Sequence, residues 1–260
     1  MLLPGCAGTP DRGPGERAAE DRRSRIYLDL GVAYLRQGEP RKALRKLQRA
    51  ESLNRDDARI HNAKALAYQQ LGFDDRAREA FRVAIERDPE DPQVRNNFGV
   101  FLARKGDREE ARAQFRKALG SPLYSTPEKA YYNLGWLARR AGESEEAEGM
   151  LRTALRLRPR YPAARLALAR LLRDQGQVEE ARQRLKPLLE RRPESVQGHL
   201  LAGELARERG DNESARQHLR RATDLAPDSR AADRARRILQ HLPVPEEDQD
   251  PESKGGKEKE

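Results

Sequence analysis

The sequence predicts an all-α protein, a right-handed superhelical solenoid of six helix pairs followed by a C-terminal capping helix. Composition is the first reason: 37% of the 260 residues are charged, 36% are hydrophobic and 5% are aromatic. Globular domains are usually about 25% charged, and the chain lacks the Val, Ile and Leu runs that buried parallel strands need. The second reason is a repeat with a period near 34 residues, which is typical of helical arrays that share small cores. Apolar runs stay well short of the ~20 residues that span a bilayer.

Glycines mark the same point of every repeat, at successive spacings of 34, 34, 36, 34 and 34 residues. A small residue precedes each glycine by seven positions, and a Leu or Phe follows it by nine. The glycines are Gly38, Gly72, Gly106, Gly142, Gly176 and Gly210; the small residues are Gly31, Ala65, Gly99, Gly135, Ala169 and Gly203; the large residues are Leu47, Phe81, Phe115, Leu151, Leu185 and Leu219.

Each of these positions has a physical role in a helix pair. Glycine supplies the left-handed conformation that ends the first helix. Acidic residues behind it, as in Gly106-Asp107-Arg108-Glu109-Glu110, suit the positive N-terminus of the second helix. Small residues let the paired helices approach closely, and the Leu or Phe fills the space between them. Pro89, Pro159, Pro193 and Pro227 lie where a second helix must stop.

These residues resemble the tetratricopeptide repeat signature. Its Tyr, Leu, Gly and Tyr or Ala positions are clearest at Tyr27, Leu30, Gly31 and Tyr34, and again at Tyr131, Leu134, Gly135 and Ala138. The predicted solenoid covers residues 24–242, and its six units begin at Ser24, Ala58, Pro92, Glu128, Pro162 and Val196. Two departures stand out, because Lys64 and Leu188 replace the usual Leu and Ala.

The two ends of the chain differ from the repeats. Residues 230–242 place Ala231, Ala235 and Ile238 on one helical stripe, as expected of a helix that caps the open end of a stack. The charged tail, residues 243–260, is expected to be disordered because it holds almost no apolar residue. Residues 7–23, rich in Gly, Pro and alternating charge, are also expected to be disordered.

The segment Leu3-Pro4-Gly5-Cys6-Ala7 resembles a bacterial lipobox, whose cysteine becomes lipidated. Residues 1–23 would then be a lipobox remnant and a flexible tether, and a lipid on Cys6 would anchor the array to a membrane surface. No charged and apolar signal region precedes it, so we expect translation to start upstream of Met1. The alternative is that Cys6 is an ordinary cysteine in a flexible terminus.

The joint between the third and fourth units is two residues longer than the others. Its Pro122, Leu123, Tyr124, Pro127 and Ala130 resemble the corresponding joint of the type IV pilus biogenesis and stability lipoproteins, the PilW/PilF family. That resemblance implies an outer-membrane lipoprotein with a pilotin role. It implies a non-enzymatic scaffold that helps the pilus secretin, the outer-membrane pore, to reach the membrane and multimerise.

The first helices of such a solenoid line its concave face, which is where a protein or peptide partner would bind. The first half of this groove is predicted to be apolar and amide-bearing, and the second half cationic with two aromatic residues. An equally supported alternative is that Leu28, Val32 and Leu66 pack against neighbouring units. The predicted groove residues are Leu28, Val32, Leu35, Asn62, Leu66, Asn96, Arg104, Lys129, Tyr132, Trp136, Arg139 and Arg170.

Catalytic, cofactor-binding and metal-binding motifs are not found in the sequence. A single cysteine excludes an internal disulfide and a Cys-rich zinc site, and the four histidines lack metal-ligand spacing. His61 and His199 take the same position of their repeats, which favours a packing role. We therefore expect neither an enzyme nor a cofactor.

Two other functions stay open. A cytosolic tetratricopeptide scaffold of another pathway fits the same repeats. A pI near 9.8 is typical of nucleic-acid-binding proteins, but arginines and glutamates alternate along the helices, which argues against a nucleic-acid partner. We expect a monomer at the periplasmic face of the outer membrane if Cys6 is lipidated, and in the cytoplasm otherwise.

Overall fold

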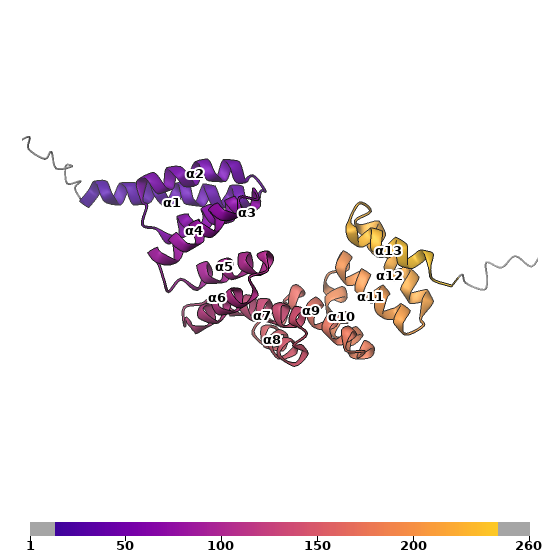
Figure 1. Ribbon diagram of the computed structural model, residues 1–260. Coiled ribbons are helices and arrows are strands. Elements are labelled where there is room, and N and C mark those ends of the chain that lie inside the picture. Colours follow the sequence, from indigo (N-terminus) through magenta and orange to yellow (C-terminus); the bar gives the residue numbers. More distant parts are fainter. Residues whose placement is uncertain (1–13, 244–260) are drawn as a thin grey trace, which may run out of the picture. The chain divides into compact units, whose positions relative to one another are not determined.

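The computed structural model describes residues 14–243, and every regular element within them is a helix (Figure 1). Twelve of the helices follow each other as six antiparallel pairs, and a thirteenth follows the last pair, which confirms the predicted all-α repeat fold. The helices are α1 (Pro14–Arg36), α2 (Pro40–Leu53), α3 (Ala58–Gln70), α4 (Asp74–Arg87), α5 (Pro92–Lys105), α6 (Arg108–Gly120), α7 (Pro127–Ala141), α8 (Ser144–Leu157), α9 (Pro162–Asp174), α10 (Val178–Arg191), α11 (Val196–Glu208), α12 (Asn212–Leu225) and α13 (Arg230–Gln240).

The chain divides into two compact units, one ending at Asn133 and the other starting at Leu134, so the boundary in the sequence falls within α7. In the first unit, α2 contacts α3, α4 contacts α5, and the first helices α1, α3 and α5 contact each other in order. In the second unit, α8, α10 and α12 contact the helices that follow them, and α9, α11 and α13 contact in order. Within each unit, a helix pair therefore buries its outer face against the next pair, as in a solenoid.

The repeat glycines end the first helices in the way that the sequence predicts. All six have positive φ, between 75° and 94°, a conformation that other residues adopt at a steric cost. The residue after each glycine donates its N–H to the carbonyl five residues earlier, as Asp107 does to Leu102 at 3.0 Å and Glu143 does to Ala138 at 3.0 Å. This is the Schellman bond, and it turns the chain directly into the second helix.

Paired helices cross at the small residue that precedes each glycine. A Cβ built on Gly99 would lie 2.6 Å from Phe115, and one on Gly135 would lie 2.8 Å from Leu151. Both Phe115 and Leu151 are buried. The side chain of the second helix therefore fills the volume that a Cβ on the first helix would need, as predicted.

Lys64 replaces a packing leucine, and the structure shows why it is tolerated. Its side chain is 14% exposed, and its Nζ donates to both carboxylate oxygens of Glu51 at 2.8 and 2.7 Å. Glu51 lies on α2 and Lys64 on α3, so an ion pair joins the first two repeats at this point. A largely buried charge needs such a partner.

The N-terminal helix is longer than the sequence suggests. It begins at Pro14, so the expectation of disorder over residues 7–23 is wrong for residues 14–23. Asp21 accepts a hydrogen bond from Asn54 Nδ2 at 3.0 Å, and Ser24 donates to the carbonyl of Ala50 at 2.9 Å. These bonds tie the first helix to the end of α2. Cys6 and residues 244–260 lie outside the described residues.

The last helix covers the end of the final pair. Ala231 and Ala235 of α13 and Leu242 just beyond it are buried in one cluster with Leu219 and Ala222 of α12. The helix itself ends at Gln240, slightly before the predicted end at residue 242. The apolar stripe seen in the sequence is therefore the face that packs on α12.

The close helix crossing can be tested with two glycines of one helix pair. Replacing Gly135 by alanine should lower the free energy of unfolding by about 1–3 kcal/mol, because the added Cβ overpacks a buried contact. Gly149 lies on α8, where an added Cβ meets no heavy atom within 4 Å. The Gly149→Ala control should raise stability by about 0.5–1 kcal/mol through helix propensity alone. Denaturant unfolding measures the free energy of unfolding of both variants. Equal changes in the two variants would contradict the close helix crossing at Gly135.

Candidate peptide-binding face

Side-chain amides link the first helices of consecutive repeats in the first unit. Gln93 Nε2 donates to Asn97 Oδ1 at 2.9 Å, and Asn97 Nδ2 donates to Asn62 Oδ1 at 3.1 Å. Asn133 Nδ2 donates to Asn96 Oδ1 at 3.1 Å. These five residues of α3, α5 and α7 form what we call the amide ladder.

The amide ladder follows the register of the repeats. Its two inter-repeat bonds each join the sixth residue of one unit to the fifth residue of the unit before. The partners are 35 residues apart in one bond and 37 in the other, because the second bond spans the longer joint. The two extra residues are thus absorbed before α7, and the pairing is restored on it.

Two predicted groove residues, Asn62 and Asn96, belong to the amide ladder and bond to partners that were not among the predicted groove residues. Asn96 is 4% exposed, whereas Asn62 is partly exposed. Within residues 14–243, no group bonds Asn62 Nδ2, so this donor is available to a ligand. Recurrent amides at the fifth and sixth positions of successive units are the sequence signal for Asn97 and Asn133, whereas Gln93 is the second residue of its unit and lies outside that pattern.

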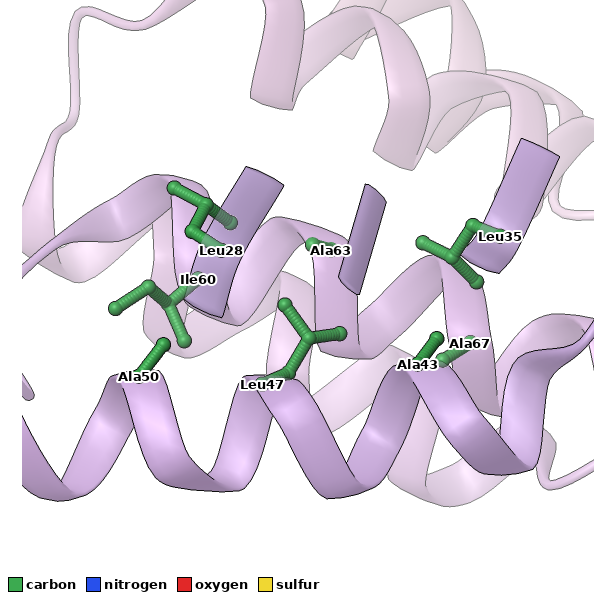
Figure 2. Close-up of a cluster of buried hydrophobic side chains, with 8 residues drawn as sticks. All are labelled: Leu28, Leu35, Ala43, Leu47, Ala50, Ile60, Ala63 and Ala67. Atoms are coloured by element: carbon green, nitrogen blue, oxygen red, sulfur yellow. The ribbon is translucent and has the colours of Figure 1, made fainter. Parts of the chain in front are cut away.

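The apolar residues predicted for the first half of the groove divide into two sets. Leu28 and Leu35 are 6% and 9% exposed and point into a core cluster with Leu47 and Ile60 (Figure 2). They are packing residues, and the prediction that they contact a ligand is corrected. Val32 and Leu66 are partly buried against the same cluster and keep exposed surface. Figure 2 labels the full cluster as Leu28, Leu35, Ala43, Leu47, Ala50, Ile60, Ala63 and Ala67.

The cationic residues predicted in the second unit are paired with the next repeat. Arg139 Nε donates to Asp174 at 3.0 Å, and Arg170 donates to Gln197 at 2.6 Å. Arg173 forms an ion pair with Glu204, which is 5% exposed. These guanidinium groups join consecutive first helices. They therefore do not form the cationic half-groove, open to acidic ligands, that the sequence predicts.

The remaining predicted groove residues differ in exposure. Trp136 is partly buried, and the guanidinium of Arg140 lies 5.1 Å from its ring centroid, within cation–π range. Lys129 and Tyr132 are partly buried, and Arg104 is exposed at the end of α5. None of these four predicted residues is one of the five residues that define the amide ladder.

The fourth residue of a repeat closes the loop that leads into it. His61 and His199 bond through Nε2 to the carbonyls of Arg55 at 2.7 Å and Pro193 at 3.0 Å. Arg95 and Arg165 donate to the carbonyls of Pro89 at 2.8 Å and Pro159 at 2.7 Å. Each acceptor lies six residues before its donor. The two histidines thus have a structural role, as the sequence suggests.

Within residues 14–243, no three His, Cys, Asp or Glu side chains lie close enough together to hold a metal ion. The helices of that range are also too short or too polar for any of them to cross a bilayer.

The comparisons with known proteins agree with this architecture. Five overlapping stretches match the family model described as tetratricopeptide repeat: residues 28–92, 62–130, 97–163, 132–183 and 166–230. The chain therefore belongs to the tetratricopeptide repeat family.

Proteins of type IV pilus biogenesis are among those to which the chain is similar. The type IV pilus assembly protein PilF of Pseudomonas aeruginosa is 28% identical over 172 residues, which are 65% of this chain and 68% of that protein. The crystal structure of PilW, a widely conserved type IV pilus biogenesis factor, matches with a TM-score of 0.73 at 29% identity, over 81% of this chain and 96% of that one. The Pseudomonas aeruginosa PilF structure matches with a TM-score of 0.74 at 25% identity, over 85% and 99% of the two chains. The chain is homologous to these PilF and PilW proteins.

A histidine pair in the last repeat predicts how stability depends on pH. The Nδ1 atoms of His199 and His218 are 3.0 Å apart. Burial, and then the nearby His199, hold the pKa of His218 below its ordinary value, with Asp211 opposing them. The unfolded chain therefore binds the proton more readily, so the free energy of unfolding should fall as the pH drops from about 7 to about 5.

The contribution of the pair is isolated by substitution. The fall in stability is measured as the decrease of the thermal unfolding midpoint between about pH 7 and about pH 5. His218→Gln should make this decrease smaller. The control, His241→Gln, changes an exposed residue at the end of α13 and should leave the fall as it is. Parallel pH curves for the wild type and His218→Gln would show that the pair has no such effect.

Proposed function

We propose that the chain is a non-enzymatic assembly factor of a type IV pilus system, and that it holds a segment of a partner protein on the first-helix face of the first unit. Homology to PilF and PilW carries the proposal. The tetratricopeptide repeats add support, because helical repeat arrays present extended surfaces to protein partners.

The chemistry of the face suggests what the partner segment is like. Asn62 offers a free amide donor beside the partly exposed apolar side chain of Leu66, and Val32 adds a second apolar contact on α1. An extended peptide presents main-chain carbonyls at regular intervals and apolar side chains between them. A segment with apolar anchors therefore fits this face better than an acidic one, since Arg139 and Arg173, which lie on the first helices of the second unit, are paired with Asp174 and Glu204.

The partner that we propose is the pilus secretin, on the grounds of the family resemblance. Cys6 would carry the lipid that keeps the chain, as a monomer, at the periplasmic face of the outer membrane. One lipid chain alone gives marginal, reversible membrane binding, so the anchor would need a fuller lipid modification or a second membrane contact.

The proposal is tested by removing the gene and measuring the secretin. Deletion should reduce the amount of secretin multimer in the outer membrane, and the full-length gene with its upstream codons should restore it. Unchanged multimers, together with a chain that fractionates with the cytosol, would overturn the proposal in favour of the cytosolic scaffold.

The face itself is tested by one substitution in the complemented strain. Asn62→Ala removes the free donor and leaves Asn97 Nδ2 without its acceptor. Binding of the purified chain to the solubilised secretin should weaken roughly tenfold, as expected for loss of a buried hydrogen bond. The matched control is Gln48→Ala, which removes an exposed amide from α2 and should bind as the wild type does. Equal binding by both variants would exclude this face.

A further inference from the structure

A cavity of about 380 Å³ lies where the start of α9 meets the end of α10 in the second unit. Arg160, Arg165, Arg191 and Arg192 line it, next to apolar surface from Pro187 and Leu188. Four arginine residues thus line one small space.

None of these four arginines forms an ion pair with a carboxylate within residues 14–243. By contrast, Arg139, Arg173 and Arg182 of the same unit have acidic partners. In the described part of the chain, the Arg165 side chain donates hydrogen bonds only to the main-chain carbonyls of Pro159 and Arg184. The positive charge around the cavity is therefore not balanced by the described part of the protein.

In the third repeat, the arginine equivalent to Arg165 has a side-chain acceptor that Arg165 lacks. Arg95 holds the same repeat position as Arg165 and donates to the Gln114 side chain, 19 residues further on, at 3.2 Å. The residue 19 positions after Arg165 is Arg184, whose own side chain is paired with Glu180 at 3.0 Å. A neutral acceptor in one repeat is thus replaced by a second cation in the other.

Two further observations indicate that the positive charge at this cavity has no negative partner in the described part of the chain. Burial, followed by the guanidinium groups of Arg191 and Arg184, lowers the pKa of Arg165 below its ordinary value. In addition, the N-cap residue of α9 is Tyr161, whose side chain makes no capping bond, whereas Asp91 and Ser195 cap α5 and α11. The positive end of α9 is left without an acidic or hydroxyl cap.

We propose that this cavity binds a phosphate group. Arginine suits phosphate because its planar fork donates paired hydrogen bonds to anionic oxygens. The four side chains start from three backbone segments, namely the loop before α9, α9 itself and the end of α10 with the loop after it. A tetrahedral phosphate accepts donors from several directions, whereas a planar carboxylate accepts them mainly in its own plane.

The proposal is independent of the partner-binding function, because the cavity is built from α9 and α10 and the amide ladder from α3, α5 and α7. Loss of either function would leave the other intact.

Nuclear magnetic resonance of the arginine Nε–H groups tests the site in the full-length chain. Titration with pyrophosphate at constant ionic strength should shift the Arg165 signal saturably, with a Kd on the order of 1 mM or below. Arg191→Gln and Arg192→Gln alter exposed side chains that bond nothing within residues 14–243, so both variants should fold. Each should weaken binding by about tenfold, as loss of a charge-assisted hydrogen bond predicts.

The matched control is Arg95→Gln, at the same repeat position on α5, which should leave pyrophosphate binding unchanged. No saturable shift, or equal weakening by Arg95→Gln and Arg191→Gln, would overturn the proposal. A pentaglutamate peptide represents acidic segments such as Glu246-Glu247-Asp248 of this chain. If that peptide binds through Arg191 and pyrophosphate does not, the site is one for carboxylates and the proposal is wrong.

Two sources of the phosphate group are distinguished with vesicles. Phosphatidylcholine vesicles with and without phosphatidylglycerol are sedimented with the wild-type chain and with Arg191→Gln. Binding that requires both phosphatidylglycerol and Arg191 supports the proposal with a lipid headgroup as the source. Pyrophosphate binding without vesicle binding supports it with a soluble phosphate ester.

Discussion

The fold depends on the contact between a small residue of one helix and a Leu or Phe of the next. Where Gly99 faces Phe115 and Gly135 faces Leu151, the two helices are so close that even a methyl group would overlap the opposing side chain. This contact sets the distance within each pair, and the glycine turn with positive φ sets its direction. Because a two-helix unit buries only its inner face, its outer face must be covered by the next repeat. That requirement explains how, within each compact unit, a chain with few apolar residues forms stacked helix pairs.

The same repeat geometry positions the polar side chains that we assign to partner binding. The amide ladder exists because equivalent residues of consecutive first helices lie side by side, so that Asn97 reaches Asn62 and Asn133 reaches Asn96. The longer joint before α7 does not disturb this register. Tyr124 in that joint is 7% exposed, whereas Leu123 is 85% exposed, so one side chain anchors the extra residues while the other faces solvent.

Much of the architecture could be predicted from the sequence, because the features that define it are local and recur. The glycine turns and small-residue crossings follow from residue type and spacing alone. The roles of individual groove residues could not be predicted in this way. Leu28 and Leu35 have the spacing of groove residues but pack in the core, and Arg139 pairs with Asp174 of the next repeat. Such choices depend on which side chain lies opposite, and the sequence of one repeat does not contain that information.

The central claim is that the first-helix face of the first unit contacts a component of the pilus assembly machinery. Site-specific photocrosslinking in living cells tests it most directly, with the crosslinking amino acid at Leu66 on α3 or, as the reference, at the exposed Glu86 on α4. The account predicts a discrete crosslinked product from position 66 that contains a pilus assembly component, and none from position 86. The same product from both positions, or no pilus component from position 66, would contradict it.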